Sequence, residues 1–294
     1  MSITFVGMNS RSSGKVRGLQ LAEIEKNFNF FDTDSGRFFG KNFFQEKVIF
    51  LRRFKPNLAK ELKNKGLKIG YDVIDRPVAE LHDLQKRNPE ADSIDWKVIC
   101  HDLIDFYIVT NTLAKQSLSL VTNKKIYVIP HHTVSNELIQ KDTSNISTIG
   151  YLGTKDQLYK REIITDVCFQ NKLNFYENHP ADQKKCIEDL KKIDIGVVYL
   201  EKNKRTDYVL KFKPNQKLSN FQCFGIPSVV VPYESYVEFG GKDSFLIANN
   251  EKELADQLNK LISDVDLRKR IQKNGYEAAK NLLVNKVIKS YSLI

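Results

Sequence analysis

Cysteine is scarce in this chain, and its spacing excludes two common kinds of site. Four cysteines occur among 294 residues, and no two of them are close together in the sequence. A zinc ribbon or a thioredoxin-type site needs closely paired cysteines, and a disulfide framework is not indicated either. We therefore expect all four thiols to be reduced: Cys100, Cys168, Cys186 and Cys223.

Long apolar stretches are also missing. No segment approaches the roughly 18 consecutive apolar residues that a membrane-spanning helix needs. The first eight residues, MSITFVGM, lack a charged leader followed by a long apolar segment and a cleavage site. We expect a cytoplasmic protein, and peripheral attachment to a membrane surface stays open.

Acidic side chains are fewer than basic ones. The chain has 46 Lys and Arg against 36 Asp and Glu, which gives a net charge of +10. The hydrophobic share of 41% is sufficient for a core and argues against a mainly disordered chain. The basic excess either serves a polyanionic partner or lies idle on the surface.

Short apolar runs alternate with longer amphipathic ones, a pattern typical of parallel sheets covered by helices. The length favours two domains, and a polar stretch over 131–147 is the best boundary. We predict an α/β fold with an N-terminal, acceptor-side domain over 1–145 and a C-terminal, donor domain over 146–294. Ligands of such sheets bind beyond the carboxyl ends of the strands, so a cleft between the domains is the expected site.

A glycine-containing loop follows the first predicted strand. The spacing from Gly7 to Gly14-Lys15 is too long for a Walker A loop, Val16 has no oxygen for magnesium, and the dinucleotide spacing is absent. Gly14 and Gly18 still allow the backbone to approach a phosphate or sugar where a helix begins. A merely flexible first turn explains these glycines equally well.

Three polar residues near the middle of the first predicted domain are candidates for catalysis. Asp75 and Arg76 follow a central predicted strand, and His101 comes later as a candidate base or hydrogen-bond donor. Alternatively, Asp75 and Arg76 pair with each other. The doublet Asp32 and Asp34 has metal-ligand spacing, but we favour a turn begun by Asp32 and expect no metal.

The second predicted domain carries a sharper pattern. Lys155 follows a glycine turn at Gly153, and Lys213 and Lys217 flank the start of a short helix near Leu218. Lysines supply charge and free amides at a helix start supply geometry, so together they bind a diphosphate without a metal. Solvated lysines around an ordinary helix are the alternative for either segment alone.

These segments resemble the donor domain of GT-B glycosyltransferases of group 1, the family-4-like enzymes. The resemblance rests on the strand 194–200, which begins Asp-Ile-Gly, and on Lys213-Pro, Lys217-Leu and the Gly-x-Pro of 225–227, in that order. It implies two Rossmann-like domains facing a cleft, a nucleotide-sugar donor such as a UDP- or GDP-sugar, no further cofactor and retention of configuration. It also implies that the last helix crosses back to the first domain.

The sequence departs from that family at the donor ribose. The usual Glu-x7-Glu pair corresponds to Phe212 and Asn220 here. Asn220 can still hydrogen-bond a ribose, but a neutral amide is a weaker acceptor than a carboxylate. A degenerate GT-B module that binds a sugar nucleotide without turnover is therefore the alternative from another functional class.

The acceptor is the least defined partner. We expect a saccharide or lipid-linked acceptor that enters past Gly14 to Gly18 and past Asp75 and Arg76. A basic segment over 52–68 suits an anionic membrane surface, and it would equally suit DNA in a phage-type DNA-modifying glycosyltransferase. A solvated helix face is the remaining interpretation of that segment.

Overall fold

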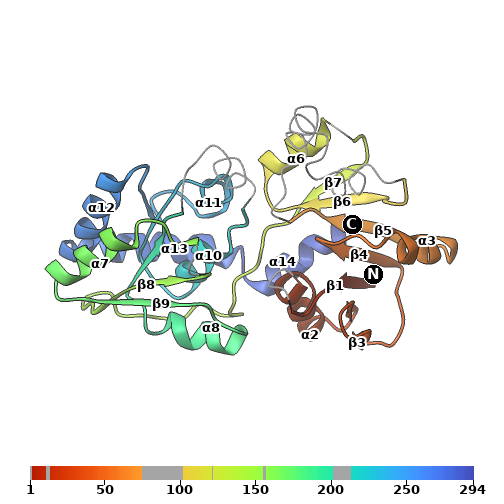
Figure 1. The fold of residues 1–294 in the computed structure, drawn as a ribbon, viewed down its shortest axis with the longest axis horizontal. Coiled ribbons are helices and arrows are strands. Elements are labelled where there is room, and N and C mark those ends of the chain that lie inside the picture. The colour runs from red at the N-terminus through yellow and green to blue at the C-terminus, as the bar shows by residue number, and fades with distance from the viewer. Residues whose placement is uncertain (1, 11–13, 75–101, 121, 155–156, 201–212) are drawn as a thin grey trace. The chain divides into compact units, whose positions relative to one another are not determined.

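The computed structural model describes residues 2–10, 14–74, 102–120, 122–154, 157–200 and 213–294. The chain divides into two compact units (Figure 1). The first comprises residues 1–131 and 288–294 with the short piece 211–213, and the second comprises 132–210 and 214–287.

The first unit is built on a seven-stranded sheet of order β3-β2-β1-β4-β5-β6-β7. All neighbours pair in parallel except β3, which forms an antiparallel hairpin with β2. Most of the strand residues are buried, as expected for strands of a parallel sheet that is covered on both faces. The strands are β1 (Ile3–Gly7), β2 (Phe28–Asp32), β3 (Arg37–Phe39), β4 (Lys47–Leu51), β5 (Lys68–Asp72), β6 (Phe106–Val109) and β7 (Lys125–Val128).

Two of the described helices of this unit begin with recognisable local signals. Pro56 occupies the first turn of α3, where its missing N–H costs nothing. The side chain of Asn111 accepts a hydrogen bond of 2.7 Å from the amide of Ala114 and caps α6. The helices are η1 (Lys15–Leu19), α2 (Gln20–Ile24), α3 (Pro56–Asn64) and α6 (Thr112–Ser119).

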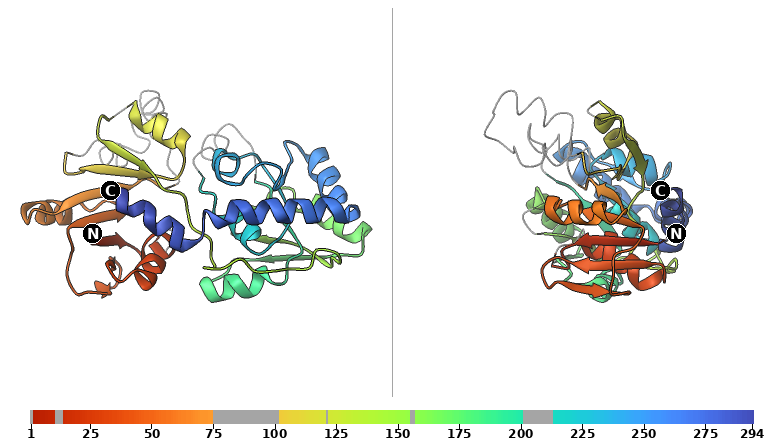
Figure 2. Two further views of the ribbon diagram at one scale, coloured as in Figure 1. Left: turned by 180° about the vertical axis from the view of Figure 1, so that it is seen from behind. Right: turned by 90° about the vertical axis from the view of Figure 1, so that its right-hand side faces the viewer.

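The C-terminal residues belong to the first unit, where the chain also begins (Figure 2). Helix α14 (Val284–Ser290) starts in the second unit and ends in the first. After it, the fully buried ring of Tyr291 packs edge-on against Phe5 and Phe28, with ring centroids 5.4 and 5.8 Å apart. The last residues are therefore part of the first unit's core.

The second unit contains a five-stranded, wholly parallel sheet of order β12-β11-β10-β8-β9. One hydrophobic core joins this sheet to its helices. The strands are β8 (Thr148–Leu152), β9 (Asn174–Asn178), β10 (Ile195–Val198), β11 (Ser228–Val230) and β12 (Leu246–Ile247). The helices are α7 (Arg161–Gln170), α8 (Gln183–Leu190), α10 (Gln216–Cys223), α11 (Glu234–Phe239), α12 (Glu251–Ser263) and α13 (Val265–Lys280).

The polar stretch 132–147 packs on the second unit as an irregular strap. Arg268, which is only 2% exposed, donates to the carbonyls of Thr143 and Ser144 at 2.7 and 2.9 Å. The hydroxyl of Tyr276 donates to the carbonyl of Ile139 at 2.8 Å. The compact second unit accordingly starts at His132, whereas the sequence places the boundary after residue 145.

Most predicted elements are present with shifted ends, and the differences have local causes. The sequence pattern predicts a helix over 19–26, but helical structure already begins at Lys15, because the chain enters it through Gly14 in right-handed helical conformation. The sequence pattern missed β3, α11 and β12, which are short. Helix α14 is the last helix, which the family resemblance expects to cross back. The sequence pattern also predicts a helix over 78–87, which lies outside the described residues. Cys168, Cys186 and Cys223 are free thiols, and Cys100 lies outside the described residues.

None of the helices among the described residues combines the length and the apolar character that crossing a membrane requires.

Candidate functional site

The ligand-binding edge of the second unit follows from its strand order. The chain enters the sheet at β8, adds β9 on one side and then adds β10, β11 and β12 on the other. The connections from β8 and β10 therefore leave the sheet in opposite directions. Doubly wound sheets bind ligands at the carboxyl ends of the strands at such a switch point.

Lys217 lies at this edge. It is in the first turn of α10, and its Nζ atom is 3.0 Å from the hydroxyl of Tyr151, near the end of β8. The same Nζ atom is 3.4 Å from Oε1 of Gln157 and 4.8 Å from the centre of the Tyr151 ring. The hydroxyl of Tyr151 in turn donates to the carbonyl of Thr154 at 3.3 Å. Lys217 and Tyr151 are 66 positions apart in the sequence. Their contact places the ammonium group of Lys217 at the end of β8.

Gly153 is the residue that lets the backbone pass close to this lysine. Its φ is +159°, a conformation that side chains other than glycine rarely adopt. A Cβ atom at this position would lie 2.8 Å from Nζ of Lys217 and would also collide with the hydroxyl of Tyr151. The predicted residues Gly153 and Lys217 are therefore brought together by the fold.

The hydroxyl of Tyr151 is a neutral partner for Lys217. Burial raises the pKa of Tyr151, and the nearby carboxylate of Glu177 raises that pKa further. Tyr151 therefore stays protonated at neutral pH and accepts a hydrogen bond from Lys217 while it donates to Thr154. Glu177 is itself paired with Arg161, whose Nη2 atom lies 2.7 Å from Oε1 of the glutamate.

The start of α10 supplies backbone donors beside the lysine. The helix has eight residues, and no side chain caps its N-terminus. The amides of its first turn have no partner within the helix, which is the usual basis of anion binding at helix starts. Leu218 is buried and anchors this turn in the core. Lys213 belongs to the first unit, whereas Lys217 belongs to the second.

Asn220, the predicted ribose contact, has a structural partner. Its side chain is 8% exposed, and its Oδ1 atom accepts a hydrogen bond of 2.8 Å from the amide of Val134. Val134 belongs to the strap that precedes β8, so Asn220 helps to hold that strap in place. A contact between Asn220 and a ribose stays a prediction.

The glycines of the first-unit loop are explained by packing. A Cβ atom on Gly14 would collide with the carbonyl of Met8. A Cβ atom on Gly18 would lie 2.5 Å from the ring of Phe30 and 2.9 Å from the side chain of Leu51. Both residues therefore allow close packing of the protein on itself. Their contact with a ligand stays a prediction.

Four predicted site residues lie outside the described residues: Asp75, Arg76, His101 and Lys155. Phe212, at the first position of the missing carboxylate pair, also lies outside them.

Asp32 begins a turn, as predicted. Its carboxylate accepts hydrogen bonds from the amides of Asn9 and Asp34 and from the hydroxyl of Ser35, at 3.0, 3.2 and 2.6 Å. These bonds outweigh the effect of burial and lower the pKa of Asp32. Within the described part of the chain, no three His, Cys, Asp or Glu side chains come together as a metal-ligand group.

Sequence reasoning missed a buried ion pair in the first unit. Both Arg17 and Asp72 are at most 1% exposed, and Nη2 of the arginine lies 2.7 Å from Oδ2 of the aspartate. Arg17 also donates to the carbonyls of Ile129 and Pro130 at 2.9 Å. Burial raises the pKa of Asp72, and the guanidinium opposes that effect. No spacing rule links residues 55 positions apart, so only the fold reveals this pair.

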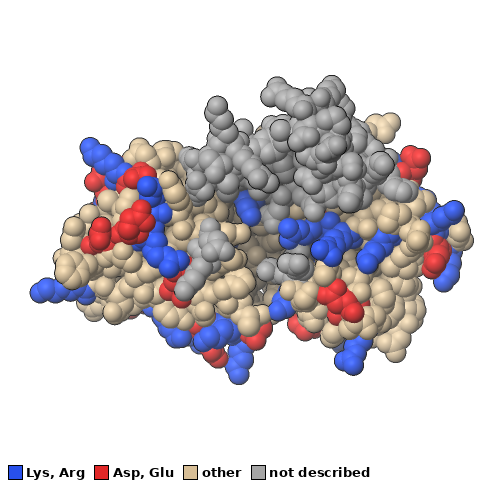
Figure 3. Space-filling model, in the orientation of Figure 1, with Lys and Arg blue, Asp and Glu red and all other residues tan. Residues whose placement is uncertain are grey.

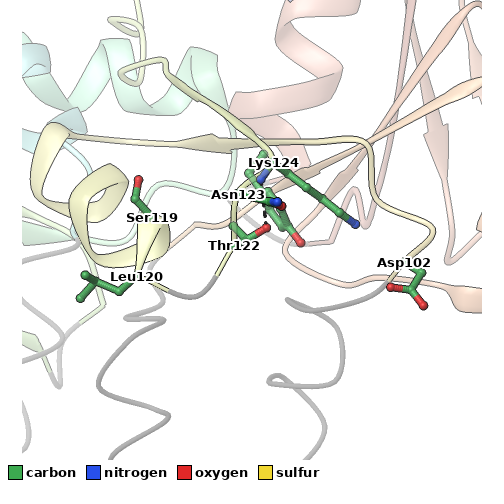
Figure 4. Close-up of a pocket in the computed structure, with 7 residues that line it drawn as sticks. Asp102, Ser119, Leu120, Thr122, Asn123 and Lys124 are labelled. Carbon is green, nitrogen blue, oxygen red and sulfur yellow. Dashed lines mark hydrogen bonds between the residues drawn. The ribbon is translucent and has the colours of Figure 1, made fainter.

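A pocket of about 460 Å³ opens at another place in the first unit (Figure 4). Its lining comes from the end of α6, from the start of β6 and the residues before it, and from the residues before β7, at the amino edge of the sheet. In Figure 4 the amide of Lys124 donates to the hydroxyl of Thr122, at 3.2 Å. This amino edge is opposite the carboxyl edge, at which parallel sheets bind their ligands. The pocket is lined by Asp102, Tyr107, Ser119, Leu120, Thr122, Asn123 and Lys124.

No protein-family model matches the sequence, and no curated protein matches it in sequence. Solved structures do match. HepE from Anabaena, crystallised with UDP and glucose, superposes with a TM-score of 0.67 at 10% identity, over 100% of this chain and 98% of that one. TarM from S. aureus, in a complex that contains UDP, gives 0.56 at 11% identity, over 90% and 60%.

Sucrose-phosphate synthase from Thermosynechococcus elongatus gives a TM-score of 0.52 at 10% identity, over 84% of this chain and 72% of that one. The chain spans 56% of the length of the matched GtfA/B chain and 60% of that of TarM. At these identities the likeness shows the fold. The chain has the GT-B fold, the architecture of two Rossmann-like units found in the glycosyltransferases that its donor-domain motifs resemble.

Proposed function

We propose that this protein is a glycosyltransferase that moves a sugar from a nucleoside diphosphate sugar to an acceptor. The observation that carries the proposal is the position of Lys217 beside Gly153 and Tyr151, at the switch point of the second sheet. That is where a doubly wound sheet binds a nucleotide. UDP in HepE and TarM supports a uridine nucleotide as the first donor to test.

The chemistry needs positive charge where Lys217 lies. Transfer breaks the bond between the anomeric carbon and the diphosphate oxygen and forms a bond from that carbon to an acceptor oxygen. The acceptor loses a proton, and the departing nucleoside diphosphate gains negative charge. An ammonium group and helix-start amides that are already in place stabilise this charge without reorganising. Lys217 and the first turn of α10 would take this role, and Lys155 and Lys213 would add charge.

Several finer parts of the proposal rest on the sequence. The family resemblance implies retention of configuration and a ribose contact by Asn220. Metal independence rests on the lysines at the helix start. Acceptor-side or catalytic roles for Asp75, Arg76 and His101 rest on their residue types and places in the chain. A carboxylate in place of Asn220 would be the stronger ribose ligand. We therefore expect ribose binding to depend on backbone groups more than on this side chain.

A panel of nucleotides and nucleotide sugars in a thermal-shift assay tests the proposal. A ligand at one hundred times its dissociation constant adds about 2.7 kcal/mol to the free energy of unfolding, so a true donor raises the melting temperature clearly. UDP or a UDP-sugar is expected to do so, with GDP-sugars as the second choice. If no nucleotide shifts the melting temperature, the proposal is wrong.

A module that binds a sugar nucleotide without turnover is the second candidate. The observation in its favour is that Asn220 stands where the family has a carboxylate and that its Oδ1 atom already holds the amide of Val134. Incubation with the donor that binds best separates the two functions. Slow hydrolysis to free sugar in the absence of acceptor supports an enzyme, and an intact donor after prolonged incubation supports the binding module.

A further inference from the structure

The first unit has its own switch point, at its most basic strand end. Strands β1 and β4 are parallel neighbours, with β2 on one side and β5 on the other, so the connections after β1 and β4 diverge. The chain continues from β4 with Arg52 and Arg53, both exposed. Figure 3 shows Lys and Arg side chains gathered across the visible face of this unit.

The basic segment 52–68 does not form a single surface. Arg52, Arg53 and Lys55 follow the carboxyl end of β4, which is the ligand-binding edge. Helix α3 then leads the chain back, and Lys65 and Lys68 lie at the opposite edge, where β5 begins. Of the basic segment, the fold therefore places Arg52, Arg53 and Lys55 at the ligand-binding edge.

Arg52 is held in a conformation that is unfavourable for arginine. Its φ is +62°, in the left-handed region that favours glycine. Its amide donates to the carbonyl of Asp72 at 3.2 Å, and its carbonyl accepts from the hydroxyl of Tyr71 at 2.9 Å. The buried ring of Phe54, 5.0 Å from that of Phe50, anchors the chain two residues later. Glycine would adopt this φ with less backbone strain than arginine does. An exposed arginine at such a position indicates that its side chain binds a ligand.

The acidic groups at this edge already have partners. Asp72 is bound by Arg17 at 2.7 Å, Asp32 by the loop after β1, and Asp34 by the hydroxyl of Ser10 at 2.6 Å. Neither Arg52 nor Arg53 forms an ion pair with an acidic side chain in the part of the chain that the structure describes. Among the described residues, no acidic side chain therefore competes with an anion for these two guanidinium groups.

We propose that Arg52 and Arg53 bind a phosphate group carried by the acceptor. Two guanidinium groups match a phosphate monoester, which carries close to two negative charges at neutral pH and offers oxygens for paired hydrogen bonds. A carboxylate carries one charge and would leave one arginine uncompensated. The role as an acceptor site depends on the proposed transferase function, and the phosphate site itself does not.

Phosphate titrations of four proteins, followed by calorimetry, test the site. The proteins are the wild type, Arg52→Gly, Arg53→Gln and the control Lys65→Gln, which removes a charge from the opposite edge of the same unit. Loss of one charge-assisted contact is expected to weaken phosphate binding about tenfold in either arginine variant. The control keeps wild-type affinity, and acetate binds the wild type more weakly than phosphate does. Arg52→Gly also keeps a wild-type melting temperature, because glycine adopts the left-handed conformation without strain.

Phosphate also has a second expected site, at the donor diphosphate. The same titration of Lys217→Ala separates the two, because that variant loses only the donor site. If Lys217→Ala abolishes phosphate binding and the arginine variants do not affect it, the inference about Arg52 and Arg53 is wrong and the donor proposal stands. If the arginine variants lose binding while no nucleotide binds at all, the phosphate site stands and the transferase function fails.

Vesicles distinguish the source of the phosphate. Vesicles of phosphatidylcholine alone and of equal parts phosphatidylcholine and phosphatidic acid are sedimented with each protein. Binding to the acidic vesicles that Arg52→Gly and Arg53→Gln both lose, and Lys65→Gln keeps, assigns the site to a lipid phosphate. Binding of soluble phosphate alone assigns it to a soluble phosphorylated acceptor. Equal loss of vesicle binding in all three variants, with soluble phosphate binding unaffected, overturns the proposal.

Discussion

The Nζ atom of Lys217 lies 3.0 Å from the hydroxyl of Tyr151 and 4.8 Å from the centre of the same ring. Tyr151 is in β8, the first strand of its sheet, and Lys217 is in the helix that precedes β11. The tyrosine therefore fixes the lysine through both its oxygen and its aromatic face. This contact places a positive charge at the switch point without neutralising it, because Tyr151 stays protonated.

Removing the hydroxyl of Tyr151 is expected to weaken donor binding while the fold is kept. In Tyr151→Phe, Lys217 keeps the aromatic face and loses the oxygen, a contact of about 1 kcal/mol. We expect nucleotide affinity to fall about fivefold, measured by calorimetry with UDP. The matched control is Tyr176→Phe, on neighbouring β9, where the hydroxyl donates a hydrogen bond of 2.6 Å to Asp189. Equal loss of affinity in both variants would contradict the positioning role.

A side chain at Gly153 is expected to disturb both stability and donor binding. In Gly153→Ala, the added Cβ meets Tyr151 and Lys217 and must adopt a φ of +159°. Strain of this kind costs about 1 to 3 kcal/mol of unfolding free energy. Gly36→Ala is the comparison, since its φ is +69° and nothing lies within 4 Å of its Cβ. Thermal unfolding should show the larger loss for Gly153→Ala, and only that variant should bind UDP more weakly.

Stability at low pH should depend on Asp189. The carboxylate is fully buried, and hydrogen bonds from Tyr176, Asn178, Lys185 and Lys192 outweigh the effect of burial, so its pKa lies below the ordinary value. Its contribution is present above the unfolded pKa of about 3.9 and is lost as the pH falls through the lower folded pKa. Asp189→Asn is therefore expected to cost about 2 kcal/mol at neutral pH.

Unfolding measured over a series of pH values tests the prediction for Asp189. In urea unfolding, the difference between Asp189→Asn and the wild type should shrink as the pH is taken below the folded pKa. Asp166→Asn, an exposed change on α7, should stay close to the wild type at every pH. A difference for Asp189→Asn that does not change with pH would refute the charge-based account.

The C-terminal residues are expected to stabilise the first unit. Tyr291 is fully buried against Phe5 and Phe28, and the guanidinium carbon of Arg17 lies 5.9 Å from the centre of its ring. Tyr291→Ala leaves a cavity among these rings and should cost about 3 kcal/mol of unfolding free energy. Leu293→Ala is the control, because that side chain is 70% exposed. Similar melting temperatures for both variants would show that the tail is not part of the core.

The sequence predicts the periodic elements well and the contacts between distant segments poorly. The sequence pattern predicts a strand over 148–152 and a helix over 251–263, and β8 and α12 have these bounds, because local pattern determines them. The two-residue β12 and the aromatic β3 carry too few residues for a period, and only pairing with β11 and β2 makes them strands. Short edge strands depend on tertiary context more than on propensity.

In the candidate site too, the sequence predicts some residues, and only the fold reveals others. A lysine after Pro-Asn-Gln at a helix start is visible in the sequence, and so is the glycine turn after β8. Tyr151 carries no such signal, because an aromatic residue within a strand is usually a core residue. The engagement of Asn220 by Val134, and the ion pair of Arg17 with Asp72, join residues 86 and 55 positions apart, and no local rule predicts such pairs.

Calorimetric titration of UDP into the wild type and Lys217→Ala tests the central claim most directly. The control is Lys252→Ala, an exposed lysine on α12 of the same unit. Loss of a charge-assisted contact to the diphosphate is expected to weaken UDP binding at least tenfold in Lys217→Ala. Lys252→Ala should bind like the wild type, and circular dichroism should show all three folded. Equal affinity of the wild type and Lys217→Ala for UDP would contradict the account.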